Sequence, residues 1–123
     1  GRDHALARCG ELSDAQLLAV PWILREAGSG TRQAFDRALY GLMPQMHILL
    51  GLQHTEAIKR AVQAGLGVGC LSRVTLEDAF RRGDLVPLQV PGRDFRRLFY
   101  FVMHRQKYRS AGLVRWIQLC REA

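Results

Sequence analysis

Short continuous apolar runs alternate along the chain with stretches in which apolar residues recur at helical spacing. Runs of this length and character are typical of strands that are covered on both faces of a sheet. They predict strands over residues 21–25, 46–52, 66–71, 84–90 and 98–103. Pro87 lies within the fourth run and places that strand at an edge, because proline cannot donate a ladder hydrogen bond.

The stretches between these runs predict helices that begin at a polar cap and end near glycine or proline. The predicted helices cover residues 15–18, 31–42, 56–64, 73–82 and a last one that begins at Ser110. Thr55 is the predicted cap of the third helix. Alternation of strands and helices with short connections predicts an α/β fold, a three-layer αβα open sheet with helices on both faces.

One stretch, residues 22–35, combines a strand, a glycine turn and the start of a helix. Gly28 and Gly30 free the backbone for a tight turn, and Ser29 or Thr31 can cap the helix that follows. A helix N-terminus flanked by two hydroxyls and by Arg32 suits a carboxylate or another anion. The alternative is an ordinary strand-to-helix loop with a good cap, and the segment alone leaves both open.

Composition places the chain among globular domains, with 48% hydrophobic and 24% charged residues in 123 positions. Its apolar runs are too short to cross a bilayer, and no charged-then-apolar leader opens it, so we expect no membrane contact. The odd number of widely spaced cysteines, Cys9, Cys70 and Cys120, indicates a reducing compartment. We therefore expect a cytoplasmic protein in which Cys70, within an apolar run, is a small core residue.

The formal net charge of +7 raises the question of nucleic acid. The basic residues are almost all arginines that are scattered along the chain, and no RNA-binding motif or zinc-finger spacing accompanies them. A dispersed positive surface helps association with acidic partners without reading a nucleotide sequence. We therefore expect no specific nucleic-acid binding by this segment itself.

Catalytic and metal motifs are not apparent in the sequence. Residues 28–30 lack the five-residue spacing of a nucleophile elbow, and no lysine follows at the position that a phosphate-binding loop requires. Nothing ties cysteine, histidine and aspartate into a triad. His4, His47 and His104 share no metal-ligand spacing. We therefore predict that the chain is not an enzyme and holds no metal and no cofactor.

Several segments together resemble the effector-binding domain of LysR-type transcriptional regulators. The matching segments, in order, are residues 21–32, 56–68, 71–72 and 83–86, with Phe99-Tyr100 and the closing helix. Their order and spacing agree over almost the whole chain. One departure is Ala27, where the family typically has proline; this changes the stiffness of the turn.

Members of that family have a winged helix-turn-helix, a linker helix and a sensor similar to type 2 periplasmic binding proteins. Such a sensor has two α/β subdomains joined by two crossover strands, with a small-molecule effector in the cleft between them. The resemblance implies that residues 1–12 end the first subdomain and crossover, and that residues 13–92 form the second subdomain. Residues 93–123 would return to the first subdomain as its last strand and helix, with the DNA-binding domain absent from this chain.

The predicted effector site lies at the carboxyl ends of the strands of the second subdomain, as is general for open α/β sheets. It comprises Gly28, Ser29, Gly30, Thr31, Arg32, Gln53, His54, Thr55 and Ser72. For Ser29 and Thr55 the alternative role is helix capping, and for His54 it is a loop position without a ligand. These hydroxyl, amide and N–H groups fit a small polar or anionic effector.

The resemblance thus predicts an effector-sensing fragment of a bacterial transcriptional regulator. We expect it to self-associate into a dimer or a larger oligomer, and to reach promoter DNA only through the missing N-terminal domain. The competing hypothesis is a solute-binding protein of a transport system, which has the same architecture. The family-like sequence of residues 56–68 favours the regulator.

Overall fold

A parallel three-stranded sheet forms the centre of the computed structural model, which describes residues 1–122. The strand order is β2–β1–β3, with β1 at Trp22–Arg25, β2 at Ile48–Leu52 and β3 at Val68–Gly69. Helix α2 (Gly30–Ala38) joins β1 to β2, and α3 (Thr55–Gln63) joins β2 to β3. Parallel neighbours require such crossovers, so the predicted α/β class is confirmed.

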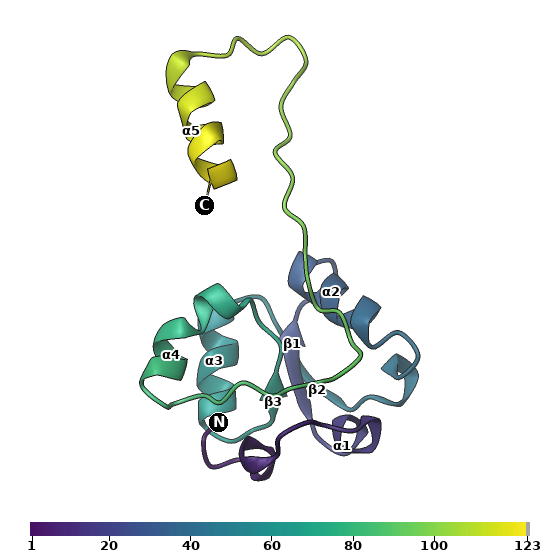
Figure 1. The fold of residues 1–123 in the computed structure, drawn as a ribbon. Helices are drawn as coiled ribbons and strands as arrows, with labels where there is room; N and C mark the ends of the chain where they lie inside the picture. Colours follow the sequence, from purple (N-terminus) through teal and green to yellow (C-terminus); the bar gives the residue numbers. More distant parts are fainter. Residues whose placement is uncertain (123) are drawn as a thin grey trace.

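Helices cover both faces of this sheet (Figure 1). Helices α3 and α4 (Glu77–Arg81) lie on one side, and α1 (Asp14–Leu18) and α2 lie on the other. Trp22 and Leu24 join the buried cluster that includes Phe35 of α2. Ile23, between them in β1, points to the opposite face, because side chains alternate across a strand. Both faces of β1 are therefore buried, as its apolar run predicts.

The segment after β3 is less regular than predicted. Instead of one helix over 73–82, a 3₁₀ turn at Arg73–Thr75 precedes α4. Both the backbone N–H and the hydroxyl of Thr75 donate to the Ser72 carbonyl, at 3.0 and 2.7 Å, which tightens this turn. The predicted strand over 84–90 is also wrong, since only a single bridge joins Gln89 to Glu11 in the described chain.

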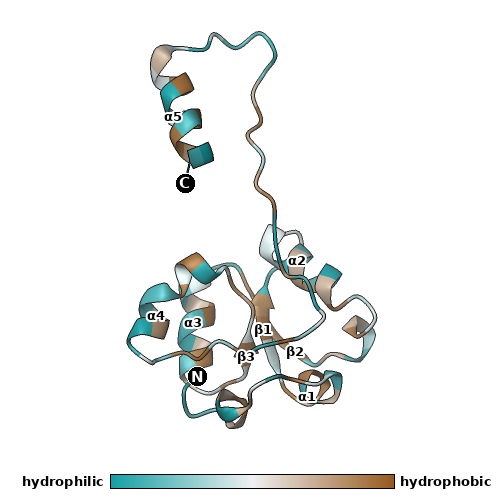
Figure 2. Cartoon of the chain, viewed as in Figure 1, coloured by the Kyte–Doolittle hydropathy of each residue, from teal (hydrophilic) through white to brown (hydrophobic). Residues whose placement is uncertain are grey.

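Residues 98–122 form an arm, which we name the C-terminal arm, that leaves the sheet-containing body (Figure 1). Its extended part leads to α5 (Ala111–Glu122), which begins at the predicted Ser110 cap. The predicted strand over 98–103 is wrong, because no strand of residues 1–122 lies beside it to complete a ladder. A largely apolar stretch opens the arm and a polar stretch leads to α5, and no other segment of the described chain covers either (Figure 2).

Two predicted helix caps have different outcomes. Ser29 Oγ accepts the Arg32 backbone N–H at 3.0 Å and caps α2. The capping role predicted for Ser29 is therefore confirmed. The prediction that Thr55 caps α3 is wrong, because the helix starts one residue earlier. The extended residue before it is His54, and Thr55 is already helical.

Replacing Ser29 with alanine is expected to lower the unfolding free energy by about 1 kcal/mol, because an N–H of α2 loses its acceptor. Thr55→Ala should change it by less than about 0.5 kcal/mol, because no cap is lost. Urea unfolding followed by circular dichroism measures both. Equal losses in the two variants would contradict this assignment of the caps.

Candidate functional site

A hollow of about 880 Å³ opens where the carboxyl ends of the strands meet the segment that leads to the arm. We call it the outer hollow. Two predicted site residues, Thr31 at the start of α2 and Ser72 after β3, line it. Four arginines line it as well: Arg73, Arg93, Arg96 and Arg97.

Two of these arginines are already paired with carboxylates. Arg93 Nη2 donates to both carboxylate oxygens of Asp14, at 2.9 and 2.8 Å. Arg96 donates to Asp94 from Nε and Nη2, both at 2.9 Å. This hydrogen-bonded guanidinium lowers the pKa of Asp94 to about 2, so the carboxylate stays charged at neutral pH. Arg93 therefore braces the segment 93–96 against the body, whereas the Arg96–Asp94 pair lies within the segment.

The other two arginines form no ion pair with a carboxylate of residues 1–122. Arg97 lies over the start of α2, where its Nη1 donates to Thr31 Oγ1 at 3.4 Å. Its guanidinium carbon is 4.2 Å from the centre of the Phe99 ring. A Cβ at Gly30 would lie 2.7 Å from Arg97 Nη1, so glycine allows this close approach.

The outer hollow therefore presents positive charge without matching negative charge. The N-terminal end of α2 carries a partial positive charge, and Arg73 and Arg97 add two full charges near it. Such an arrangement attracts anions and disfavours cations. Hydroxyls of Thr31 and Ser72 supply hydrogen-bonding groups on the same lining.

Comparison with known proteins places this architecture in a family. Residues 1–123 match the family described as the LysR substrate binding domain. The chain belongs to this family. The predicted resemblance is thereby confirmed.

Relatives of this LysR domain are transcriptional regulators. The chain is 44% identical over 115 residues to the HTH-type regulator YeiE of Escherichia coli K12, covering 94% of itself and 39% of that protein. It is 37% identical over 105 residues to the RuBisCO operon transcriptional regulator of Allochromatium vinosum, covering 85% of itself and 35% of that protein. The chain thus spans less than half the length of these relatives. Their character as regulators confirms the prediction that the chain is not an enzyme.

A solved structure supports the fold of this LysR domain. The CcmR regulatory domain of Synechocystis PCC6803, solved in complex with 2-PG, superposes with a TM-score of 0.81 at 30% sequence identity. The match covers 96% of this chain and 57% of the other. No helix in the described part of the LysR domain is long and apolar enough to cross a membrane.

The remaining predicted site residues do not line the outer hollow. Arg32 is occupied within α2, where its Nε donates to Asp36 at 2.7 Å and its Nη1 to the Arg25 carbonyl at 3.3 Å. Ser29 is the cap, and Gly28 supplies the turn with a φ of 92°. A separate group lies at the end of β2 and the start of α3: Gln53, His54 and Thr55.

That second group lies near a different charge pair. Arg25 donates to Glu26 at 2.7 and 2.8 Å. This hydrogen bond is the main reason why the pKa of Glu26 is lowered, and the charge of His54 contributes weakly. Because the guanidinium of Arg25 is already paired with Glu26, it offers little free positive charge to an anion near Gln53, His54 and Thr55.

Sequence reasoning missed Arg73 and Arg97. Arg73 directly follows the predicted Ser72, so extending the site by one residue would have found it. Arg97 lies far along the chain from Thr31, and only the path of residues 93–97 across the body brings the two together. The scattered positions of the arginines along the chain do not indicate that Arg97 lies beside Thr31.

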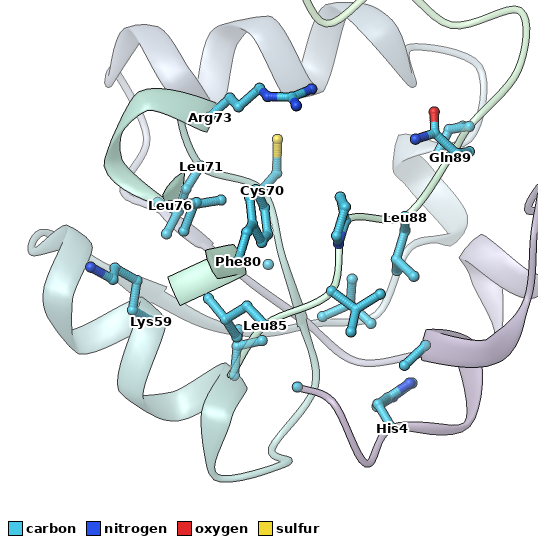
Figure 3. Close-up of a pocket in the computed structure, with 18 of the residues that line it drawn as sticks. His4, Lys59, Cys70, Leu71, Arg73, Leu76, Phe80, Leu85, Leu88 and Gln89 are labelled. Atoms are coloured by element: carbon cyan, nitrogen blue, oxygen red, sulfur yellow. The ribbon is translucent and has the colours of Figure 1, made fainter. Parts of the chain in front are cut away.

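A second cavity, which we call the apolar chamber, is drawn in Figure 3. It shares part of its lining with the outer hollow. Its volume is about 400 Å³. Cys70 lines both spaces, and burial raises the pKa of its thiol to about 11. The prediction that Cys70 is a small core residue holds only in part, because Cys70 is half-buried and packs against the edge of the core cluster.

The raised pKa of Cys70 should slow the chemical modification of its thiol. At pH 8 the Cys70 thiol is almost entirely protonated, and its thiolate population rises only as the pH approaches about 11. The exposed Cys120 is therefore expected to react with a disulfide reagent at least about tenfold faster than Cys70. Mass spectrometry after timed quenching measures the order. Modification of Cys70 first would contradict the raised pKa of its thiol.

Proposed function

We propose that the chain is the effector-sensing part of a LysR-type transcriptional regulator, and that its effector is a small anion held in the outer hollow. The observation that carries this proposal is the pair Arg73 and Arg97, which face the hollow without a carboxylate partner in the described chain. Thr31 and Ser72 would orient the anion through their hydroxyls. The CcmR domain in complex with 2-PG supports a small-molecule role for this fold.

The domain assignment remains part of this proposal. Residues 1–12 would end the first subdomain, residues 13–92 would form the second, and residues 93–123 would return to the first. The outer hollow would then be one wall of a cleft whose other wall the first subdomain supplies. Promoter DNA would be bound by an N-terminal domain, in the cytoplasm.

We also propose that Gly28, Ser29, Gly30 and Arg32 support this wall rather than touch the effector. Gln53, His54 and Thr55 would contact only an effector that extends beyond the outer hollow. A solute-binding transport protein is the alternative function for this architecture. The regulators among the relatives favour sensing over transport.

Self-association is the second part of the proposed function. The C-terminal arm carries large apolar side chains that are mostly exposed, among them Phe99 and Trp116. Burial of such side chains is favourable by roughly 1.5–3 kcal/mol each. We propose that two copies cover each other's arms, which gives a dimer or a larger oligomer.

Anion titration tests the effector proposal. We expect Arg97→Gln to weaken the binding of 2-PG, and of inorganic phosphate as a compact probe, by about tenfold to a hundredfold. A lost hydrogen bond to a charged group has this effect. Arg105→Gln, an exposed arginine outside the hollow, is the matched control and should bind as the parent does.

Isothermal calorimetry on the 123-residue chain measures both affinities. Binding should be weak, because one wall alone contacts the anion, and a longer protein that includes the first subdomain should bind more tightly. Equal affinity in the parent and in Arg97→Gln would overturn the proposed anion site. Equal affinity in the short and long proteins would overturn the two-walled cleft.

A further inference from the structure

The proposed anion site does not use the interior of the apolar chamber. The chamber lies between the sheet, α4 and the segment 85–90 (Figure 3). Large apolar side chains dominate its lining: Trp22, Phe35, Leu76, Phe80, Leu85 and Leu88. No aspartate or glutamate is among its lining residues within the described chain.

The size of the apolar chamber suits a small organic molecule. An apolar protein cavity of about 150 Å³ holds one benzene molecule. The chamber, at about 400 Å³, has room for a larger apolar body such as a substituted six-membered ring. Pockets that bind small molecules commonly begin near this volume and are lined mainly by apolar and aromatic side chains.

The mouth of the chamber adjoins the outer hollow. Seven residues line both spaces: Cys70, Leu71, Arg73, Leu88, Gln89, Val90 and Phe95. Figure 3 shows the Arg73 side chain above the Cys70 sulfur, with Gln89 across the chamber. Arg73 is the only positively charged side chain on this shared lining in the described chain.

The other basic side chains of the chamber are already engaged. Lys59 Nζ donates to Glu56 at 2.8 Å, and that salt bridge lies on α3. His4 Nδ1 accepts the backbone N–H of Leu6 at 3.2 Å, which ties the ring to its own turn. The charge that an incoming group meets at the mouth is therefore that of Arg73.

We propose that the apolar chamber is a second small-molecule site, which takes the apolar body of a monocarboxylic acid whose carboxylate is bound by Arg73. The apolar lining stabilises the body by removing it from water. The guanidinium supplies a charge-assisted hydrogen bond to the carboxylate, with the geometry that arginine offers to such groups. This inference shares Arg73 with the proposed anion site, but it does not rest on that site, because it needs neither Thr31 nor Arg97.

Fluorescence of Trp22 reports on this site directly. The chain has two tryptophans, so the Trp116→Phe variant leaves Trp22, which lines the chamber, as the single emitter. The probe is 3-cyclohexylpropionate, which does not absorb in the tryptophan range, and its neutral control is 3-cyclohexylpropionamide. We expect a saturable change with the acid, and weaker binding of the amide by about tenfold.

Variants at the mouth and in the chamber separate charge from volume. Arg73→Gln should weaken binding of the acid by about tenfold and leave binding of the amide unchanged. Arg81→Gln on α4, outside the chamber, is the control and should change the affinity for neither probe. Leu76→Phe fills the chamber and should abolish binding of both. Leu88→Phe replaces it as the filling variant if Leu76→Phe does not fold, as judged by circular dichroism.

Two outcomes overturn the inference. One is the lack of a saturable change with millimolar acid in the parent, and the other is parental affinity in a folded filling variant. Equal weakening of acid and amide by Arg73→Gln overturns the role of Arg73. Arg97→Gln should keep the affinity for the acid and weaken the binding of phosphate. Failure of the proposed anion site can therefore be told apart from failure of the proposed chamber site.

Discussion

Replacing Phe35 with alanine is expected to lower the free energy of unfolding by about 3–5 kcal/mol. Phe35 is 1% exposed and lies in the cluster between α2 and the sheet. Its ring centroid is 4.9 Å from that of Trp22 and 6.4 Å from that of Phe95. Alanine would remove both contacts and leave a cavity that the surrounding elements fill only in part. A loss of this size is a large fraction of the about 5–15 kcal/mol by which folded domains are stable.

Urea unfolding followed by circular dichroism measures this loss. Tyr40→Ala is the control, because Tyr40 is 84% exposed just beyond the same helix and should change the unfolding free energy by less than about 0.5 kcal/mol. If the alanine variant does not fold, Phe35→Leu should show a smaller loss, since leucine fills part of the space. A Phe35→Ala variant as stable as Tyr40→Ala would show that α2 does not depend on this contact.

Removal of residues 98–123 is expected to abolish self-association while the body stays folded. No residue of the C-terminal arm belongs to the buried core, whereas its side chains are among the most exposed apolar ones in the described chain. Val102 is 92% exposed. The ring centroids of Trp116 and Phe101 are 5.4 Å apart in an edge-on arrangement, and Trp116 is still 53% exposed. An apolar surface of this kind favours association with a partner.

Sedimentation velocity at micromolar concentration compares the two chains. The 123-residue chain should sediment as a dimer or larger species, and the chain that ends at residue 97 should sediment as a monomer that still unfolds cooperatively in urea. Arg105→Gln is a matched control within the arm that keeps its apolar residues. A parent chain that is strictly monomeric and protects Trp116 from iodide quenching would contradict the role of the arm.

Local signals in the sequence predicted much of the body. The apolar run before Gly28 and the hydroxyl after it predict β1 and the start of α2, and the structure places both there. The buried face of α2 follows from the spacing of Ala34 and Phe35 with later apolar residues. Such features depend on neighbours within a few residues, which a single sequence contains.

Features that depend on distant partners could not be predicted in the same way. Leu98–Met103 has the composition of a strand, but a strand needs a second chain segment beside it, and the described residues supply none. The meeting of Arg97 with Thr31 depends on the path of the whole connection. The start of α3 shifted by one residue because an extended conformation at His54, which composition does not determine, set the boundary.

The order of the strands has a consequence for synthesis on the ribosome. The central strand β1 is made first, and its two neighbours, β2 and β3, follow later in the sequence. A nascent chain that has passed only Arg25 therefore exposes both hydrogen-bonding edges of the strand that is most buried in the folded protein, and the second edge closes only when Gly69 has emerged. Unpaired edges of this kind invite association with other nascent chains. The interval between these two events is the period in which a chaperone would have the largest effect on the yield of folded protein.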